Sequence, residues 1–114
     1  MITIRSVIGE VAVFDQTLGY AQSAVAGMQL TPGHNYLVVP VKEKAEATLV
    51  GFGKTTKLAY GEYYVITRNG EIRQGKHREK SSTRLFFGRL WAFICKEHED
   101  LKLPQTNAAI GVRG

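Results

Sequence analysis

The chain has 114 residues and 44% hydrophobic content, enough to bury one modest core, so we expect a single domain covering residues 1–114. The formal net charge of +5 favours an acidic partner such as nucleic acid, an anionic envelope polymer or a lipid surface. One cysteine, Cys95, excludes an internal disulfide and a multi-cysteine metal site. The sequence has no apolar run of about 18 residues and no signal-peptide pattern. It therefore predicts no transmembrane segment, and an exported form would have its leader outside this sequence.

The first residues predict two short strands. Residues 2–8 are rich in β-branched side chains, Gly9 interrupts them, and residues 10–14 resume the same character. Residues 15–26 lack a clear 3.6-residue period and contain a glycine, which favours a hairpin connection or an irregular strand over a helix.

A turn is predicted next. In Thr-Pro-Gly at residues 31–33, Pro32 and Gly33 occupy the second and third positions of a turn, the combination that a type II turn requires. The short segment that begins at Gly27 leads into this turn.

The middle of the chain continues as short strands. Strand-like runs lie at residues 35–39, 45–50, 55–59 and 62–67. Pro40 marks the end or edge of the first, since it cannot donate to a sheet. Gly-Phe-Gly at 51–53 predicts a reversal, and Asn69-Gly70 is typical of a tight hairpin turn. Turns at this spacing indicate an all-β domain of short strands, arranged as a twisted β-roll or solenoid-like sandwich.

Residues 68–84 concentrate the positive charge of the chain. The candidate binding residues are basic and all lie in this segment: Arg68, Arg73, Lys76, Arg78, Lys80 and Arg84. Residues 75–83 include no apolar side chain, which predicts an exposed basic loop. Residues 85–87 and 89–94, separated by Gly88, are expected to form central strand structure, since both alternating faces are apolar. A charged reversal at 96–100 and a short strand at 101–103 follow.

The closing segment, 104–114, has a composition that core packing does not explain. Pro104 opens it, small residues follow, and Gly111 and Gly114 bracket Val-Arg. Glycine permits tight turns and close approach of backbones, so this ending indicates structure rather than catalysis. Arg113, with small residues on both sides, is expected to hydrogen-bond backbone carbonyls.

No catalytic or metal-binding motif stands out. The three histidines, His34, His77 and His98, lack the short spacing that places two imidazoles on one metal. No serine lies in a nucleophile elbow. Gly53-Lys-Thr resembles the end of a phosphate loop, but residue 48, where that loop needs its first glycine, is threonine. We therefore expect no enzyme activity, no metal and no cofactor.

Three stretches, in this order, resemble the FecR domain, an extracytoplasmic all-β module of bacteria. Ile-Gly-Glu-Val-Ala-Val at 8–13 is similar to the opening of that family. Residues 27–58 look like its G-x-x-L-x-x-G-D turn and the strands that follow. Gly-Arg-Leu at 88–90 and residues 103–114 are similar to its T-P-x-A-x-x-x-V-R-G-T ending. The matching positions that carry the structural motif are Gly27, Pro32, Gly33, Gly88, Pro104, Gly111, Arg113 and Gly114.

The chain also departs from the FecR pattern. His34 stands where Asp is usual, Gly-Phe-Gly at 51–53 replaces Asp-Gly-Ser, and Leu103 replaces Thr. The resemblance implies a periplasmic or extracellular protein-protein interaction domain, in envelope signalling or cell-surface assembly, with a protein partner in the envelope or self-association.

Two other functions remain open. A strand-like end could complete the sheet of a neighbouring copy, so the chain would be the subunit of a surface filament assembled by β-strand addition. Alternatively, aromatic residues near the basic loop would let a small β-barrel bind single-stranded nucleic acid, although core packing also accounts for those aromatic residues. A cytoplasmic location also remains open.

Overall fold

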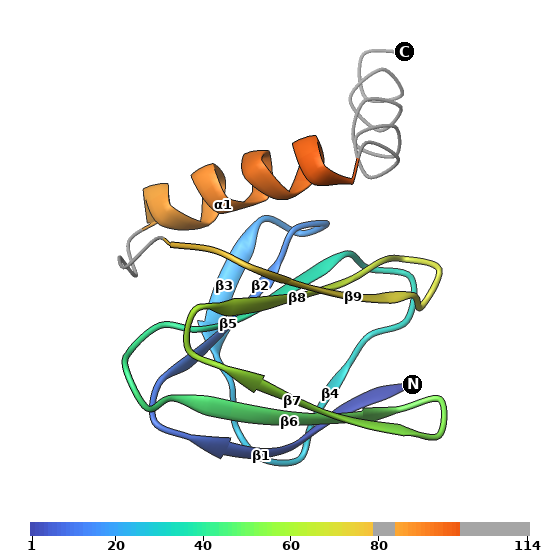
Figure 1. The fold of residues 1–114 in the computed structure, drawn as a ribbon. Helices are drawn as coiled ribbons and strands as arrows, with labels where there is room; N and C mark the ends of the chain where they lie inside the picture. The colour runs from blue at the N-terminus through green and yellow to red at the C-terminus, as the bar shows by residue number, and fades with distance from the viewer. Residues whose placement is uncertain (79–83, 99–114) are drawn as a thin grey trace. The chain divides into compact units, whose positions relative to one another are not determined.

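The computed structural model describes residues 1–78 and 84–98 (Figure 1). The chain separates into two compact units, Met1–Ser82 and Thr83–Gly114, and each is described by itself. The single domain expected over residues 1–114 stays a prediction.

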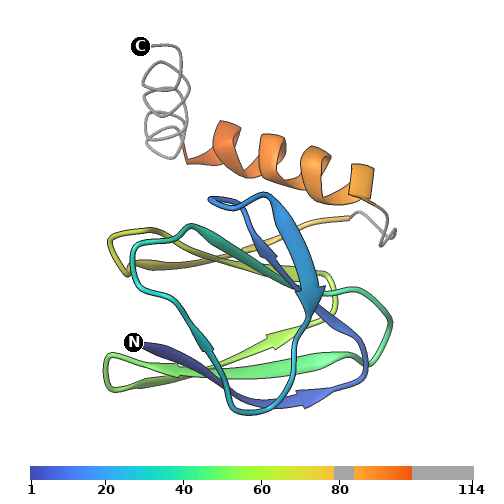
Figure 2. The ribbon, with the colours of Figure 1, turned by 180° about the vertical axis from the view of Figure 1, so that it is seen from behind.

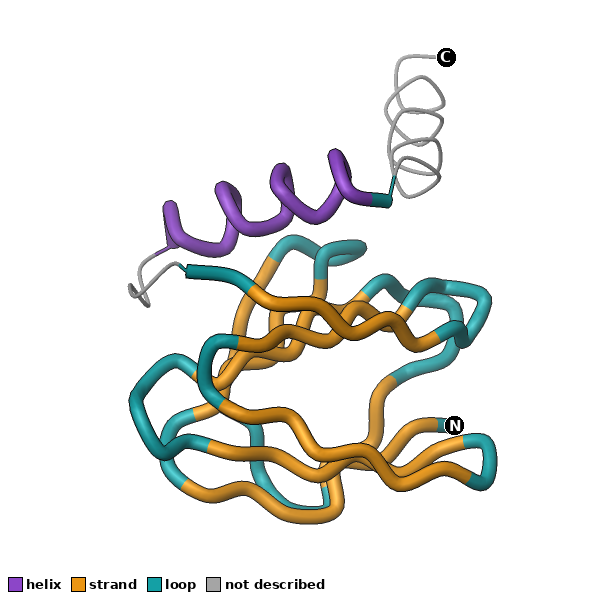
Figure 3. The backbone as a smooth tube through the Cα atoms, in the orientation of Figure 1, coloured by secondary structure: helices purple, strands orange, loops and turns teal. Residues whose placement is uncertain are grey.

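The first unit contains two antiparallel sheets (Figures 1 and 3). The first sheet has the order β4-β1-β6-β7 and consists of β1 (Ile2–Ile8), β4 (Met28–Leu30), β6 (Glu46–Gly51) and β7 (Lys54–Ala59). The second has the order β3-β2-β5-β8-β9 and consists of β2 (Val11–Asp15), β3 (Tyr20–Ser23), β5 (Tyr36–Pro40), β8 (Glu62–Ile66) and β9 (Ile72–Lys76). The all-β prediction is confirmed, and Figure 2 shows the same strands from behind.

Alternating side chains of both sheets form one hydrophobic core. In β2, Val11 and Val13 are buried while Ala12 between them is only partly buried, as expected for a strand with one face on the core. The core residues are Ile2, Ile4, Val11, Val13, Ala24, Leu30, Tyr36, Val38, Ala45, Ala47, Leu49, Leu58, Tyr64 and Ile66. Because these residues come from both sheets, the core holds the two sheets together.

The long strand β1 changes its inward-facing residues halfway along. The pairing register with β6 shifts between Ile4 and Ser6, which places a bulge at Arg5. Ile2 and Ile4 are therefore buried before the bulge, whereas Val7 packs against the core after it. The alternation in the sequence breaks at this point for the same reason.

The predicted turns are present. Gly33 has a φ of 90°, the left-handed value that the third position of a type II turn needs. Between β8 and β9, the Gly70 N–H donates to the Thr67 carbonyl at 2.8 Å, which closes the turn over Arg68 and Asn69. The hairpin connection expected at 15–26 contains β3, which pairs with β2.

Two expectations for the basic segment and the residues after it are wrong. Gly75 and Lys76 end β9 and do not belong to a loop. Gly75 faces Tyr63 across the sheet, and a Cβ at this glycine would collide with the Tyr63 ring, so the aromatic side chain lies over the glycine. Residues 79–83 of the expected loop lie outside the described residues.

The strands expected at 85–94 are helical instead. Helix α1 (Arg84–Glu97) belongs to the second unit and includes Gly88 and Cys95. Its larger apolar residues recur three or four positions apart, as at Phe87, Leu90 and Ile94, which is a helical period. The prediction of a strand was wrong because apolar residues occupy both the even-numbered and the odd-numbered positions, which hides the helical period. The His98 N–H donates to the Ile94 carbonyl at 2.8 Å, so the expected reversal begins as a continuation of the helix.

The expected strand at 101–103 and the closing segment, with Pro104, Gly111, Arg113 and Gly114, lie outside the described residues.

Candidate functional site

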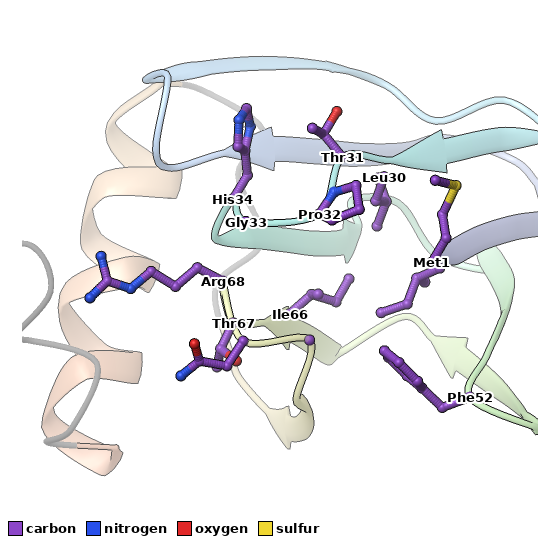
Figure 4. A pocket seen from close by; sticks show the side chains of 13 residues that line it. Met1, Leu30, Thr31, Pro32, Gly33, His34, Phe52, Ile66, Thr67 and Arg68 are labelled. Carbon is purple, nitrogen blue, oxygen red and sulfur yellow. The ribbon is translucent and has the colours of Figure 1, made fainter.

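A pocket of about 270 Å³ lies between the two sheets at one end of the first unit (Figure 4). We call it the sheet-end pocket. Its walls come from the start of β1, the connection from β4 to β5, the β6–β7 turn and the β8–β9 turn, through Met1, Ile2, Leu30, Thr31, Pro32, Gly33, His34, Phe52, Ile66, Thr67, Arg68, Asn69 and Gly70. Met1, Leu30, Ile66 and Phe52 surround the hollow in Figure 4, whereas the Arg68 side chain extends outward from the rim.

Phe52 is the most unusual residue of this pocket. It forms the two-residue loop between β6 and β7 with Gly53, and both have positive φ, 53° and 75°. Such loops favour Asn, Asp or Gly, because a side chain at positive φ is strained. The Phe52 side chain is also 65% exposed. Neither the turn nor the core accounts for a phenylalanine at this position.

The ring of Phe52 lies against the turn of the other sheet. A Cβ at Gly70 would be 3.0 Å from its Cζ atom, closer than ordinary contact. Phe52 and Gly70 thus bring the β6–β7 and β8–β9 turns together at the rim of the pocket.

A buried carboxylate lies behind the His34 wall. Asp15, only 2% exposed, accepts the Leu18 N–H through Oδ1 at 2.9 Å and contacts His34 Nδ1 through Oδ2 at 2.8 Å. Because a carboxylate oxygen only accepts, His34 Nδ1 is the donor in this contact. His34 also stacks on Tyr36, with ring centroids 5.9 Å apart. These contacts fix the orientation of the imidazole.

Asn35 connects three loops at this end. Its N–H donates to Thr17 Oγ1 at 2.8 Å, its carbonyl accepts the Gln16 N–H at 2.9 Å, and its side-chain Oδ1 accepts the Arg68 N–H at 2.9 Å. The Tyr36 hydroxyl accepts the Thr31 N–H at 2.9 Å, which holds the turn at Pro32. The loops that line the pocket are therefore fixed by hydrogen bonds before any ligand arrives.

The predicted basic residues do not gather on one face of the described structure. Arg68 lies in the β8–β9 turn, and Arg73 and Lys76 lie in β9, where their odd and even positions place them on opposite faces. Arg73 is also paired with Glu71 at 3.1 Å. Arg78 follows β9, Lys80 lies outside the described residues, and Arg84 begins α1 in the second unit.

The predicted structural residues of the first unit are all in turns or connections. Gly27 and Gly33 have positive φ, and the Gly27 N–H donates to the Ile4 carbonyl at 2.7 Å. Pro32 and Gly33 line the sheet-end pocket. Phe52 was not predicted as a site residue, although a phenylalanine between two glycines in the turn of a hairpin was the available signal. Asp15 and His34 lie 19 positions apart, with no spacing motif that relates them.

A second surface of interest is the free side of β3, at the edge of the second sheet. All four residues of β3 are exposed, and β2 is its only partner within the described residues. Leu18, Tyr20 and Val25, in and beside this strand, are large apolar side chains exposed to solvent. An exposed strand edge with apolar residues is a common template for pairing with another chain.

Over residues 1–78 and 84–98, no three His, Cys, Asp or Glu side chains are grouped closely enough to hold a metal ion. None of the helices described has the length and apolar character needed to cross a lipid bilayer.

Comparison of the chain with models of protein families, with curated proteins and with solved structures gives no match.

Proposed function

We propose that this chain is a non-enzymatic protein-protein interaction domain that binds its partner through the edge strand β3. The observation that carries the proposal is the combination of an exposed strand edge with exposed apolar side chains on and around it.

The hydrogen-bond register identifies the backbone groups that β3 offers. The Ala24 N–H donates to the Val11 carbonyl at 2.8 Å, so this pair is of the hydrogen-bonded kind. Such pairs alternate along an antiparallel ladder, and Gln22 opposite Val13 is therefore also bonded to β2. Ala21 and Ser23 belong to non-hydrogen-bonded pairs, so their N–H and C=O groups point away from β2.

The opposite side of β2 supports the same assignment. The Val41 N–H donates to the Glu10 carbonyl at 3.0 Å and the Gln16 N–H donates to the Asn35 carbonyl at 2.9 Å, so the even-numbered residues of β2 face β5. The odd-numbered residues, including Val13, then face β3. A strand of a partner can add to β3 through Ala21 and Ser23.

Backbone hydrogen bonds alone bury little apolar surface, and the apolar side chains beside this edge supply it. Tyr20 is 45% exposed, and tyrosine is enriched at protein interfaces because its ring is apolar and its hydroxyl is polar. Leu18 and Val25 extend the apolar surface on either side of the strand. Together they favour a protein partner over a polyanion.

The resemblance to the FecR domain suggests where the partner is found. On that basis we propose a periplasmic or extracellular location and a role in envelope signalling or cell-surface assembly. Self-association into a filament by β-strand addition is a second candidate, because the same edge would pair with another copy.

Photo-crosslinking in cells that express the protein tests the proposal. p-Benzoylphenylalanine replaces Tyr20 in one variant and Thr55, an exposed residue of β7, in a control variant. We expect one discrete crosslinked protein from position 20 and none of the same mass from position 55. Adding Ala21→Pro should remove the crosslink, since proline blocks the outward N–H. A crosslink that persists with proline at position 21 would contradict pairing through β3.

Light scattering after size-exclusion chromatography separates the two candidates. Larger species that form as the concentration rises and disappear with Ala21→Pro would favour the filament. A concentration-independent monomer would leave a different protein as the partner.

A further inference from the structure

We propose that the sheet-end pocket receives one aliphatic or aromatic side chain of a partner peptide, with an acidic residue next to it in that peptide. This site does not depend on pairing through β3, and it would hold if the proposed function were wrong.

Phe52 is the first observation that points to a ligand. A φ of 53° strains a phenylalanine, and a residue that is 65% exposed gains little from burial in the free protein. Its contribution would come from covering a ligand, because a ligand in the pocket would remove that ring surface from water. Strained residues of this kind concentrate at binding sites.

The walls of the pocket select an apolar group. Leu30, Pro32, Ile66 and Phe52 line it, and Met1, which is 62% exposed, contributes a flexible thioether side chain. The volume of about 270 Å³ is below the roughly 300–1,000 Å³ that is usual for small-molecule pockets. It suits one side chain that enters from an extended peptide.

Charge at the rim selects the neighbouring residue. Apart from His34, Arg68 is the only lining residue with an ionisable side chain, and none of the lining residues is acidic. Arg68 is exposed, and no ion pair involves its guanidinium within the described residues. A carboxylate beside the apolar anchor would meet this guanidinium, whereas a lysine would be repelled.

The geometry is set in advance. Asn35 holds the Arg68 backbone, and Tyr36 holds the Thr31 turn on the opposite wall. Since these loops are already ordered, binding a short peptide costs little further entropy in the protein.

Nuclear magnetic resonance titration of the full 114-residue chain tests the site with three blocked dipeptides: Ac-Leu-Glu-NH2, Ac-Leu-Lys-NH2 and Ac-Ala-Glu-NH2. We expect Ac-Leu-Glu-NH2 to shift the amide signals of Phe52, Ile66 and Gly70 in a saturable way, with a dissociation constant in the millimolar range. Ac-Ala-Glu-NH2, which lacks the apolar anchor, should bind roughly tenfold more weakly. Ac-Leu-Lys-NH2 should bind at least about threefold more weakly than Ac-Leu-Glu-NH2.

Two variants and a control separate binding from folding. Phe52→Asn should weaken binding of Ac-Leu-Glu-NH2 by roughly tenfold while keeping the fold, because asparagine tolerates positive φ. Arg68→Gln should reduce the preference for Glu over Lys and keep the preference for Leu over Ala. Lys44→Asn changes a second non-glycine residue with positive φ, outside the pocket, and should leave binding unchanged.

Three results would overturn the proposal. The first is no saturable shift at the pocket with Ac-Leu-Glu-NH2 at any soluble concentration. The second is binding of Ac-Leu-Lys-NH2, or of the small alcohol 2-methyl-1-propanol, as tightly as Ac-Leu-Glu-NH2. Either result would mean that the pocket binds apolar groups without selecting an acidic neighbour. The third is unchanged binding by a folded Phe52→Asn variant.

Discussion

Among the described residues, two that are not glycine adopt a backbone conformation that usually belongs to glycine or asparagine. Phe52 and Lys44 have φ values of 53° and 68°. At positive φ the Cβ atom approaches the backbone carbonyl, which costs roughly 1–2 kcal/mol per residue. Lys44 lies in a short turn that is closed by a hydrogen bond from the Ala45 N–H to the Lys42 carbonyl at 3.0 Å. Its side chain is exposed, and a polar side chain is well solvated there. Phe52 differs because it also leaves an aromatic ring exposed.

Phe52→Asn should therefore make the protein more stable. We expect the free energy of unfolding to rise by about 0.5–1 kcal/mol, since the strain falls and little buried area is lost. Urea unfolding at neutral pH measures the change, and Lys44→Asn should give a gain of similar size. A loss of stability with Phe52→Asn alone would mean that the ring contributes to the fold through its contact at Gly70.

Tyr64 limits the stability of the folded protein at alkaline pH. Burial, together with the nearby Glu62 carboxylate, raises the pKa of Tyr64 to about 12. Its hydroxyl donates to the Lys57 carbonyl at 3.2 Å, which links β8 to β7. The neutral form is favoured in the folded state, so the stability from this group is complete below pH 10, the unfolded pKa, and is lost as the pH rises to about 12.

The expected loss between these two pH values is as much as about 3 kcal/mol. Tyr64→Phe should be less stable at neutral pH by about 1 kcal/mol because the hydrogen bond is gone, and its stability should fall less steeply above pH 10. Urea unfolding from pH 8 to about 11.5 compares the two proteins. Parallel curves would show that other groups cause the alkaline unfolding.

At the scale of elements, the sequence predicted strands and turns where local chemistry decides the conformation. Pro32-Gly33 and Asn69-Gly70 identified their turns because Gly33 and Gly70 adopt the positive φ that these turns need, 90° and 85°. The bulge at Arg5 could not be predicted, since it follows from how β1 pairs with β6. Helix α1 was predicted as strand because neighbouring residues such as Leu90 and Trp91 are both apolar, so apolar side chains fill even and odd positions alike and fit a strand as well as a helix.

The candidate sites were predictable only in part. The basic residues were found by composition, but the alternation of β9 separates Arg73 from Lys76, and composition carries no such information. Asp15, His34 and Asn35 come together through the fold, because β2 pairs with β5. The free edge of β3 could not be predicted either, since only the strand order shows which strand is outermost.

Two proline substitutions in β3 test the assignment of its backbone groups. Ala21→Pro should change the free energy of unfolding by less than about 1 kcal/mol, because that N–H points away from β2. Gln22→Pro should cost about 1–3 kcal/mol, since it removes a bond to β2 and leaves a carbonyl of β2 without its donor. Urea unfolding measures both. Similar costs at the two positions would show that the register is shifted.

At the scale of the first unit, one buried residue couples loops that are distant in sequence through its backbone and its side chain. Asn35 bonds to Thr17 in the β2–β3 loop and to Arg68 in the β8–β9 turn, and so orders one end of the sandwich. The core holds the two sheets together, but it does not fix these loops. The shape of the sheet-end pocket therefore depends on this polar contact as well as on apolar packing.

Asn35→Ala should lower the free energy of unfolding by about 1–2 kcal/mol, because the Arg68 N–H loses its acceptor. Amide exchange at Arg68 and Gly70 should also become faster than the change in global stability explains. Asn69→Ala, in the same turn but exposed, should be nearly neutral and is the matched control. Equal effects of the two substitutions would contradict a coupling role for Asn35.

The central claim is that the outer side of β3 is a binding edge, and amide hydrogen exchange at three neighbouring residues tests it most directly. In the free protein, Ala21 and Ser23 should exchange fast while Gln22 between them is protected by β2. When the protein captured by crosslinking at position 20 is added, Ala21 and Ser23 should become protected and Gln22 should change little. Exchange at Ala21 and Ser23 that is slow in the free protein, or that stays fast with the captured protein bound, would contradict the claim.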